Sequence, residues 1–287
     1  MKIHDCFLFF NELDLLELRL QETFDHVDRF VILESDRTFT GQPKDFNLAA
    51  NWDRFKPYAD KIKYIKCREL SVGLTPFENE ARSREFLKRG LHGYDPDDLV
   101  IISDVDEIFR PSTLIEMRER NQVSYGFRMA NFAFKINYLA QTWWQGGAAT
   151  RMSKIVQMEH LRHRRFNIGP GEGGIFMHAG WHFSWLGDES AIKLKLASFS
   201  HQELNIPEVV DNLDIKKMIE NKKGLEPESF EYKDIVKHEL VAVDEYYPDT
   251  IKNNMIKWLP HIAPGGVKSA RQLMSAQPAF LRLPATQ

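Results

Sequence analysis

The chain has 287 residues, of which 43% are hydrophobic and 12% aromatic, enough for one large α/β domain or two smaller ones. Its 38 basic and 41 acidic side chains nearly balance, and the formal charge of -3 gives no support for a general binder of nucleic acids or membrane surfaces. Two cysteines, Cys6 and Cys67, are too few for a disulfide framework and lack the spacing of a metal site.

The first 120 residues alternate between apolar strand-like runs and segments with helical spacing. The N-terminal apolar run is too short for a signal peptide core or a membrane span, so we expect a soluble, cytoplasmic protein. The alternation predicts an α/β fold whose central sheet is mainly parallel and flanked by helices. Strands are expected over residues 2–10, 28–34, 61–65 and from 99, and helices over 13–20 (N-cap Asn11), 77–91 and 111–117.

The second half of the chain does not continue the alternation of strands and helices. Two strands are expected over 124–129 and 131–136, and helical structure from Ser190 to Lys223. Residues 263–287 carry Pro, Gly, Ser and Ala without periodicity, which predicts an irregular tail. Because no linker stands out, residues 1–262 are expected to form a single domain.

An acidic motif follows the apolar run that begins at Leu99. Four apolar residues and a serine lead directly into Asp104, Asp106 and Glu107. A run without alternation predicts a strand buried on both faces, so its acidic end belongs at the carboxyl edge of the sheet, where α/β proteins bind ligands. In extended geometry Asp104 and Asp106 point the same way and can share Mg²⁺ or Mn²⁺, which can grip a nucleotide diphosphate. The alternative is that these acids cap the helix over 111–117.

A second group of polar and aromatic residues alternates over residues 178–185. In a strand, two imidazoles and a hydroxyl would share one face and three aromatic rings the other. His182 could supply a further metal ligand or steady a phosphate, and the alternative is that the histidines form hydrogen bonds within the core. The polar face holds His178, Gly180, His182 and Ser184, and the aromatic face holds Trp181, Phe183 and Trp185.

Several other polar residues have both a binding and a structural interpretation. Asn79 and Arg82 share a helix face, where Arg82 could donate to a phosphate or a base carbonyl, or simply pair with glutamates. Glu34 closes a buried strand, a position that either caps a turn or contacts a ligand hydroxyl. The basic run 162–165 could steer an anionic ligand, but such a run is usually a solvated surface.

Familiar nucleotide-binding signatures do not occur in the sequence. The glycine-rich segment 169–174 lacks the GxxxxGK[ST] arrangement, and no Rossmann fingerprint follows the first strand. An aspartyl-phosphatase is disfavoured because no Gly-Thr follows the pair Asp104 and Asp106.

Four segments together carry a family resemblance. They are DCFLFFNELDLLELRL (5–20), FVILES with TFTG (30–41), DVDEI (104–108) and GWHFSW (180–185). In this order they resemble glycosyltransferase family 17, the family of β-1,4-mannosyl-glycoprotein β-1,4-N-acetylglucosaminyltransferases. The ordered set covers most of residues 4–205 and is far more specific than the DxD motif alone.

The resemblance implies a GT-A-like fold, a UDP-sugar donor (UDP-GlcNAc first), a divalent cation and inversion at the anomeric carbon. Asp106, assisted by Asp104, would hold Mn²⁺ or Mg²⁺ on the donor diphosphate, with His182 as a further ligand or phosphate contact. The residues expected to contact or lie near the donor are Asn11 and Glu34, beside the uridine, together with Asn79 and Arg82.

The acceptor implied by the resemblance is a glycan. Inversion needs a base to take the proton of the acceptor hydroxyl, and the candidates are Glu107, Glu172, Asp188 and Glu189. Glu172 and Asp188 are favoured because both lie in loops that flank the second group. The membrane anchor and stem of the animal enzymes are absent from this sequence, which predicts a bacterial or viral member.

Two other functions use the same features. A metal-dependent hydrolase or sugar nucleotidyltransferase could use the acidic edge, and a non-catalytic carbohydrate-binding module could use the tryptophans. The hydrolase would release UDP without an acceptor, the nucleotidyltransferase would form UDP-sugar from UTP, and the binding module would need neither UDP nor metal.

Overall fold

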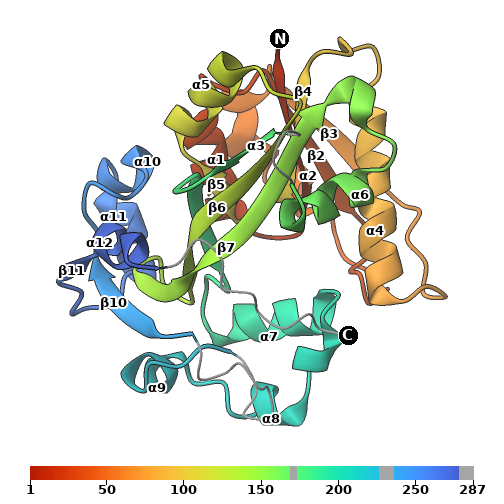
Figure 1. The fold of residues 1–287 in the computed structure, drawn as a ribbon. Coiled ribbons are helices and arrows are strands. Elements are labelled where there is room, and N and C mark those ends of the chain that lie inside the picture. The colour runs from red at the N-terminus through yellow and green to blue at the C-terminus, as the bar shows by residue number, and fades with distance from the viewer. Residues whose placement is uncertain (169–172, 226–235, 278–287) are drawn as a thin grey trace. The chain divides into compact units, whose positions relative to one another are not determined.

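The computed structural model describes residues 1–168, 173–225 and 236–277 (Figure 1). The chain divides into two compact units, and strands β6 (Ser124–Ala133) and β7 (Tyr138–Arg151) each contribute residues to both. The first unit comprises Met1–Arg128, Gln145–Gly180 and Ser198–Ser200, and the second comprises Met129–Trp144, Trp181–Ala197 and His201–Gln287.

The first unit is built on four parallel strands in the order β3-β2-β1-β4. In this register Phe7 of β1 lies opposite Ile32 of β2 and Ser103 of β4. The apolar runs of β1, β2 and β4 are buried along nearly their whole length, as the absence of alternation predicts. The α/β prediction with parallel strands is confirmed, and the carboxyl ends of these strands meet at one edge. The strands are β1 (Ile3–Phe9), β2 (Arg29–Ser35), β3 (Ile62–Cys67) and β4 (Leu99–Asp104).

Helices cover both faces of this sheet. On one face Cys6 and Val100 belong to a core that includes Leu161 of α6. Helix α4 covers the same face and contacts β1 and β2 (Figure 1). Phe7 points to the opposite face because alternate residues of a strand do, and there its ring lies 4.2 Å from the guanidinium carbon of Arg19 on α1. The helices of this unit are α1 (Leu13–Thr23), α2 (Asn47–Ala50), α3 (Trp52–Phe55), α4 (Pro76–Phe86), α5 (Pro111–Arg120) and α6 (Met158–His163), with 3₁₀ turns at Lys56–Tyr58, Leu87–Gly90, Met152–Lys154 and Arg164–Phe166.

The predicted N-cap of the first helix is wrong by one residue. α1 begins at Leu13, so Glu12 occupies the N-cap position. The Glu12 carboxylate accepts hydrogen bonds from the main-chain N–H groups of Phe10 and Asn11. Asn11 therefore lies in the loop between β1 and α1, just beyond the carboxyl end of β1.

Strand β7 extends the sheet of the first unit and is absent from the predicted elements. Its last residues run antiparallel to β4, with Ala148 opposite Ile102. A Cβ atom on Gly147 would lie 2.3 Å from the carbonyl oxygen of Ile102, so the close approach of β4 requires glycine there. Gly146 and Gly147, for which no strand is predicted, thus lie inside one. β5 (Glu107–Phe109) follows the end of β4, and β8 (Gly173–Phe176) pairs in parallel with the first residues of β6.

The second unit combines the last residues of β6 with β9, and the first residues of β7 with β10. The two strands predicted over 124–129 and 131–136 are one strand, which ends at Ala133 before Phe134 adopts a φ of 64°. The strands are β9 (Gly180–Ser184), β10 (His238–Ala242) and β11 (Lys268–Ser269), and the helices are α7 (Glu189–Ser198), α8 (Pro207–Val210), α9 (Ile215–Glu220), α10 (Asp249–Lys252), α11 (Met255–Trp258) and α12 (Ala270–Ser275), with 3₁₀ turns at Gln202–Leu204 and Leu259–His261.

The segment from residue 263 onward is more regular than its composition predicts. β11 and α12 occupy residues 268–275, because Ala270 and Met274 supply one buried helix face. The assignment of residues 1–262 to a single domain stays a prediction.

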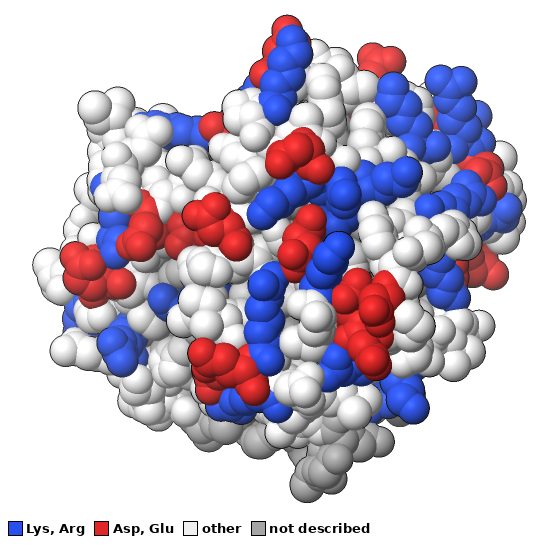
Figure 2. Space-filling model, turned by 90° about the horizontal axis from the view of Figure 1, so that it is seen from above, with Lys and Arg blue, Asp and Glu red and all other residues white. Residues whose placement is uncertain are grey.

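Charges of both signs are interleaved over the face seen in Figure 2. Exposed arginines of the first unit pair with acids, as Arg89 does with Glu69 and Arg118 with Asp28, both at 2.5 Å. The near balance of charge in the composition thus recurs locally on the surface. Among the described residues, no helix has the length and apolar character needed to cross a membrane.

Candidate functional site

The acidic motif lies in a turn rather than in an extended strand. β4 ends at Asp104, Val105 and Asp106 form the turn, and β5 begins at Glu107. The prediction of extended geometry from Asp104 to Asp106 is therefore wrong, and alternation along a strand no longer supports a common direction for the two side chains. The turn does lie where the sequence places it, at the carboxyl end of β4 in a set of parallel strands. We call residues 103–107 the acidic turn.

The three acids of this turn have different environments. The Asp104 side chain is 38% exposed, whereas Asp106 is 5% exposed and Glu107 is fully buried. The alternative in which they cap the following helix is also wrong, because α5 begins at Pro111 with Arg110 at its N-cap position. Burial of carboxylates at such a turn requires partners of opposite charge.

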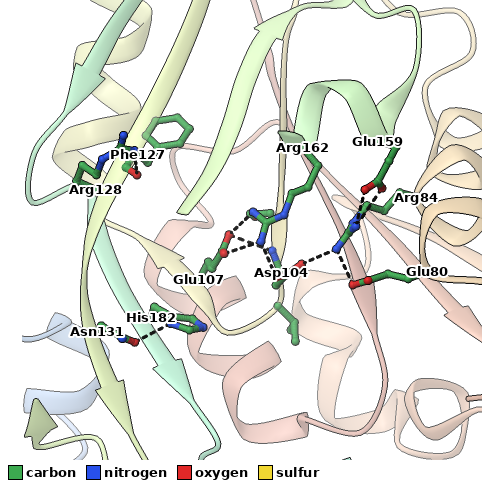
Figure 3. A network of polar contacts seen from close by, with 12 residues as sticks. Glu80, Arg84, Asp104, Glu107, Phe127, Arg128, Asn131, Glu159, Arg162 and His182 are labelled. Carbon is green, nitrogen blue, oxygen red and sulfur yellow. Dashed lines mark hydrogen bonds and ion pairs between the residues drawn. The ribbon is translucent and has the colours of Figure 1, made fainter. Parts of the chain in front are cut away.

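Arg162, from α6, supplies one such partner (Figure 3). Its guanidinium is 2% exposed and donates to both carboxylate oxygens of Glu107 at 3.0 and 2.8 Å, and to Oδ2 of Asp104 at 2.5 Å. Burial opposes the charge, but Asp104 and Glu107 raise the pKa of Arg162 above its usual value. The interpretation of residues 162–165 as a solvated surface is thus wrong for Arg162. Burial, and then the charge of Arg162, lower the pKa of nearby Arg165 to about 10.

A second guanidinium approaches Asp104 from α4. Arg84 lies 3.6 Å from Oδ1 of Asp104 and donates to Glu80 at 2.6 Å and to Glu159 at 3.0 and 3.1 Å. The arginine of α4 that reaches the acidic turn is therefore Arg84. Arg82, the arginine that the sequence favours, stacks on an aromatic ring of its own helix instead. Figure 3 shows Asp104 between the two guanidiniums.

Glu34 lies at the end of β2 and is fully buried. Its carboxylate accepts four hydrogen bonds, which match the four acceptor positions that the two oxygens offer. Burial and then this carboxylate raise the pKa of the Tyr64 hydroxyl. A direct contact between Glu34 and a ligand would have to displace one of these donors. The donors are Lys44 Nζ (2.9 Å), the main-chain N–H groups of Asn47 (2.5 Å) and Leu48 (3.1 Å), and the Tyr64 hydroxyl (2.6 Å).

Asn79 is likewise buried and engaged with main chain. Its side-chain oxygen accepts from the N–H of Ser71, and its amide nitrogen donates to the carbonyls of Ser71 and Phe39. The side chain therefore joins two loops of the first unit. Asn79 is therefore part of the fold's internal hydrogen bonding, and the alternative of a solvated helix face is wrong for this residue.

His182 belongs to β9 in the second unit. Its Nδ1 lies 2.8 Å from Oδ1 of Asn131, and its ring stacks on Trp144 at 4.1 Å. Because an amide oxygen only accepts, this contact requires a proton on Nδ1, so in a neutral ring Nε2 would be the nitrogen able to bind a metal. His178 does not share the strand face with His182 as predicted, because β9 begins at Gly180 and His178 has a φ of 54°.

Of the two predicted bases, Asp188 and Glu172, the structure describes only Asp188. Asp188 accepts from Ser190 Oγ at 2.6 Å and from the N–H of Ala191 at 2.9 Å, and these bonds lower its pKa. Its carboxylate thus occupies a capping position at the first turn of α7. Glu172 lies outside the described residues.

Three arginines that surround the acidic turn are absent from the predicted site. Arg19 carries a signal in the sequence, because it follows Leu15 by four and Leu16 by three and so falls on the apolar face of its helix. Arg84 lies on the helix that carries Asn79 and Arg82, and Arg162 opens the basic run 162–165, so the sequence points to both segments. It does not single out either arginine, since each stands among other charged residues that are typical of a solvated face.

The acidic turn offers oxygen donors of the type that divalent cations take. Carboxylate oxygens are the ligands that Mg²⁺ and Mn²⁺ prefer, and the Asp104 side chain reaches solvent. Within the described ranges, no group of three or more His, Cys, Asp or Glu residues is arranged to hold a metal. A cation at Asp104 and Asp106 would therefore need ligands beyond those the turn supplies, such as phosphate oxygens.

The family of the chain follows from sequence comparison. Glycosyltransferase family 17 matches residues 1–267. The chain belongs to this family. It is also 27% identical over 224 residues to the beta-1,4-mannosyl-glycoprotein 4-beta-N-acetylglucosaminyltransferases of Rattus norvegicus and Homo sapiens. Each match covers 66% of this chain and 41% of the relative, so this family 17 chain corresponds to less than half the length of those proteins.

One solved structure shows a distant likeness to this family 17 chain. It is the crystal structure of the glycosyltransferase GlyE in Streptococcus pneumoniae TIGR4, with a TM-score of 0.30 and 12% sequence identity over 76% of this chain and 53% of that one. A likeness at this level carries no argument about fold or function.

Proposed function

We propose that this family 17 chain transfers a sugar, N-acetylglucosamine in the first instance, from a UDP-sugar to a hydroxyl of a glycan acceptor. The family match over residues 1–267 supports the reaction class, and the names of the relatives support the sugar. The observation that carries the proposal is the position of the acidic turn, where carboxylates meet the edge at which parallel sheets bind ligands. The expected GT-A-like organisation is part of this proposal.

In this proposal Asp104 and Asp106 hold Mn²⁺ or Mg²⁺ against the donor diphosphate. His182 belongs to the second unit, and its role as a further ligand or phosphate contact stays a prediction. When bound, the cation would neutralise charge on the departing nucleoside diphosphate. Arg162 and Arg84 restrain the Asp104 carboxylate from two sides, so its orientation is set before a ligand arrives. Preorganisation of this kind lowers the cost of binding.

The donor site in this proposal adjoins the ends of β1 and β2. Contact of Asn11 and Arg82 with the donor stays part of the proposal, whereas Glu34 and Asn79 would act on the site through the loops that they hold. Proton removal from the acceptor hydroxyl is assigned to Glu172 or Asp188. A general base contributes a factor of about 10²–10⁴ to the rate. The variant that removes the base, Glu172→Gln or Asp188→Asn, should therefore lose about that factor in kcat, and the other variant should keep it.

The decisive experiment is calorimetric titration of UDP and UDP-GlcNAc, with and without Mn²⁺. The wild type should bind both nucleotides in a metal-dependent manner, and Asp106→Asn should lose that binding. Asp60→Asn changes an exposed aspartate of the same unit and serves as the matched control. Absence of nucleotide binding under every metal condition would overturn the proposal and favour a glycan-binding module.

A second measurement separates the transferase from a hydrolase that uses the same carboxylates. UDP release from UDP-GlcNAc is followed with and without a glycan acceptor. Release that depends on the acceptor supports transfer, and equal release without it supports hydrolysis.

A further inference from the structure

The side chain of Arg19, on α1, is fully buried beside the acidic turn. Its Nε and Nη2 donate to the two carboxylate oxygens of Asp5 on β1, at 2.8 and 2.5 Å. The rings of Phe7 and Phe109 lie 4.2 and 5.7 Å from the guanidinium carbon. The charge of Arg19 is thus balanced by Asp5, and the aromatic rings restrict the guanidinium to one orientation.

The other donors of this guanidinium reach the main chain of the acidic turn. Nη1 donates to the carbonyl oxygen of Asp104 at 2.7 Å and to that of Glu107 at 2.9 Å, and Nη2 donates to Ser103 Oγ at 2.5 Å. These two carbonyls stand on either side of Asp106 in the chain. One rigid group therefore joins the last residue of β4 to the first residue of β5 across the turn.

We propose that Arg19 is a positioning residue, which fixes the main chain around Asp106 and so presents the Asp104 and Asp106 carboxylates to their ligand. This inference rests on the proposed function, in which those carboxylates hold a cation on the donor. The chemistry of arginine suits the task, because five donors in a planar fork can serve a carboxylate and two carbonyls at once. A lysine ammonium is a single point with three donors and cannot span the same acceptors.

A merely structural ion pair would behave differently from a positioning residue. Asp5 offers the comparison, since within the described part of the chain its carboxylate bonds to Arg19 and not to the acidic turn. Asp5→Asn removes the ion pair, which lowers stability as a whole, but it keeps an amide oxygen as an acceptor and leaves the three donors to residues 103–107 in place. Arg19→Lys keeps the charge beside Asp5 and removes the fork. If Arg19 positions the turn, only Arg19→Lys should loosen residues 104–107.

The test is hydrogen exchange of the main-chain amides of residues 104–107, measured without ligand. The amide of Asp104 is a direct probe, because it donates to Oε2 of Glu107 within the turn. Arg19→Lys should speed exchange there by on the order of tenfold relative to both wild type and Asp5→Asn. Arg54→Lys is the matched control, because Arg54 pairs with Asp14 and Glu17 of the same helix and not with the turn.

A titration of UDP with Mn²⁺ on the same proteins provides the second readout. Arg19→Lys should weaken binding by about 10–100-fold, the usual loss when a supporting partner of a metal site is removed, while Asp5→Asn and Arg54→Lys bind as the wild type does. Should Arg19→Lys fail to fold, Asp5→Asn with Arg19→Gln removes both buried charges and replaces it in both assays.

Unchanged exchange at residues 104–107 in the Arg19 variants overturns the inference, as does equal loosening in Asp5→Asn. Failure of every Arg19 variant to fold also overturns it, because Arg19 would then be a folding residue. If the wild type binds no nucleotide, the proposed function fails, and the exchange data still decide whether Arg19 holds the turn.

Discussion

The two ends of strands β1 and β4 both carry buried charged groups, but they use them differently. At the amino ends, His4 Nε2 lies 2.9 Å from Asp98 Oδ2, and the other Asp98 oxygen accepts from the N–H of Lys2 at 2.7 Å. Asp28 accepts from the N–H of Ile3 at 2.8 Å. Each acid there completes the hydrogen bonding of a chain segment that enters the sheet.

At the carboxyl ends the arrangement is centred on one side chain that solvent reaches. Arg162 and Arg84 approach the Asp104 carboxylate from two helices, and the buried Glu107 carboxylate forms an ion pair with Arg162. The Asp104 side chain is nevertheless 38% exposed. Buried charge at the amino ends therefore closes the fold, whereas buried charge at the carboxyl ends restrains a carboxylate that solvent reaches.

The largest expected effect concerns the buried pair at the carboxyl ends. Glu107→Gln leaves the Arg162 guanidinium buried with half of its partners, so the free energy of unfolding should fall by about 3–5 kcal/mol in urea titrations. Glu69→Gln breaks the exposed pair with Arg89 and should change stability little. Equal stability of the two variants would contradict the role of Glu107 as the counter-charge of Arg162.

Asp106→Asn is expected to separate function from stability. The substitution keeps the size of a side chain at the turn, and it removes a carboxylate that the proposed function assigns to the cation. Transfer from UDP-GlcNAc should fall by more than about 100-fold, with a much smaller change in the midpoint of urea unfolding. A variant that retains wild-type transfer rates would show that Asp106 has no part in donor binding.

Asp98→Asn is the counterpart at the amino ends. Loss of the carboxylate weakens the bonds to His4 and to the Lys2 amide, so the free energy of unfolding should fall by about 1–3 kcal/mol. The kcat of the folded protein should match that of the wild type, because this end of the sheet is remote from the acidic turn along both strands. A change in kcat at full folding would contradict the division between the two ends.

The part of the first unit that sequence predicts best is also the part with the strongest pattern. The run from Leu99 is apolar without interruption because both faces of β4 are covered, and its acids mark the end of the strand. β7 escapes prediction because Gly146, Gly147 and two alanines have low strand propensity, although contact with β4 leaves no room for a larger residue at Gly147.

The candidate site shows the same limit in its charged residues. The sequence identifies the carboxylates, because acids after a buried strand need an explanation. It places Arg162 only within the basic run 162–165, which has the composition of a surface, and does not predict the contact of Arg162 with these carboxylates. The contact that buries Arg162 joins residues 58 and 55 positions apart in the chain, and periodicity within one segment carries no information about such a contact.

The smallest expected effect is a pH dependence at the amino ends. Burial lowers the pKa of His4 below 6.5, although Asp98 and Asp28 oppose this and Lys2 adds to it. Because the unfolded chain then binds a proton at His4 more readily than the folded protein, stability falls as the pH drops below about 6.5. Asp98 acts in the same direction at lower pH. Burial raises its pKa, but hydrogen bonds from His4 and the Lys2 amide outweigh burial and hold the pKa of Asp98 below the usual range.

His4→Gln should therefore lose less stability than the wild type between pH 7 and pH 5 in urea titrations, while His92→Gln, which changes an exposed histidine, should follow the wild type. A His4→Gln curve that parallels the wild type over this range would show that His4 is not buried in its neutral form.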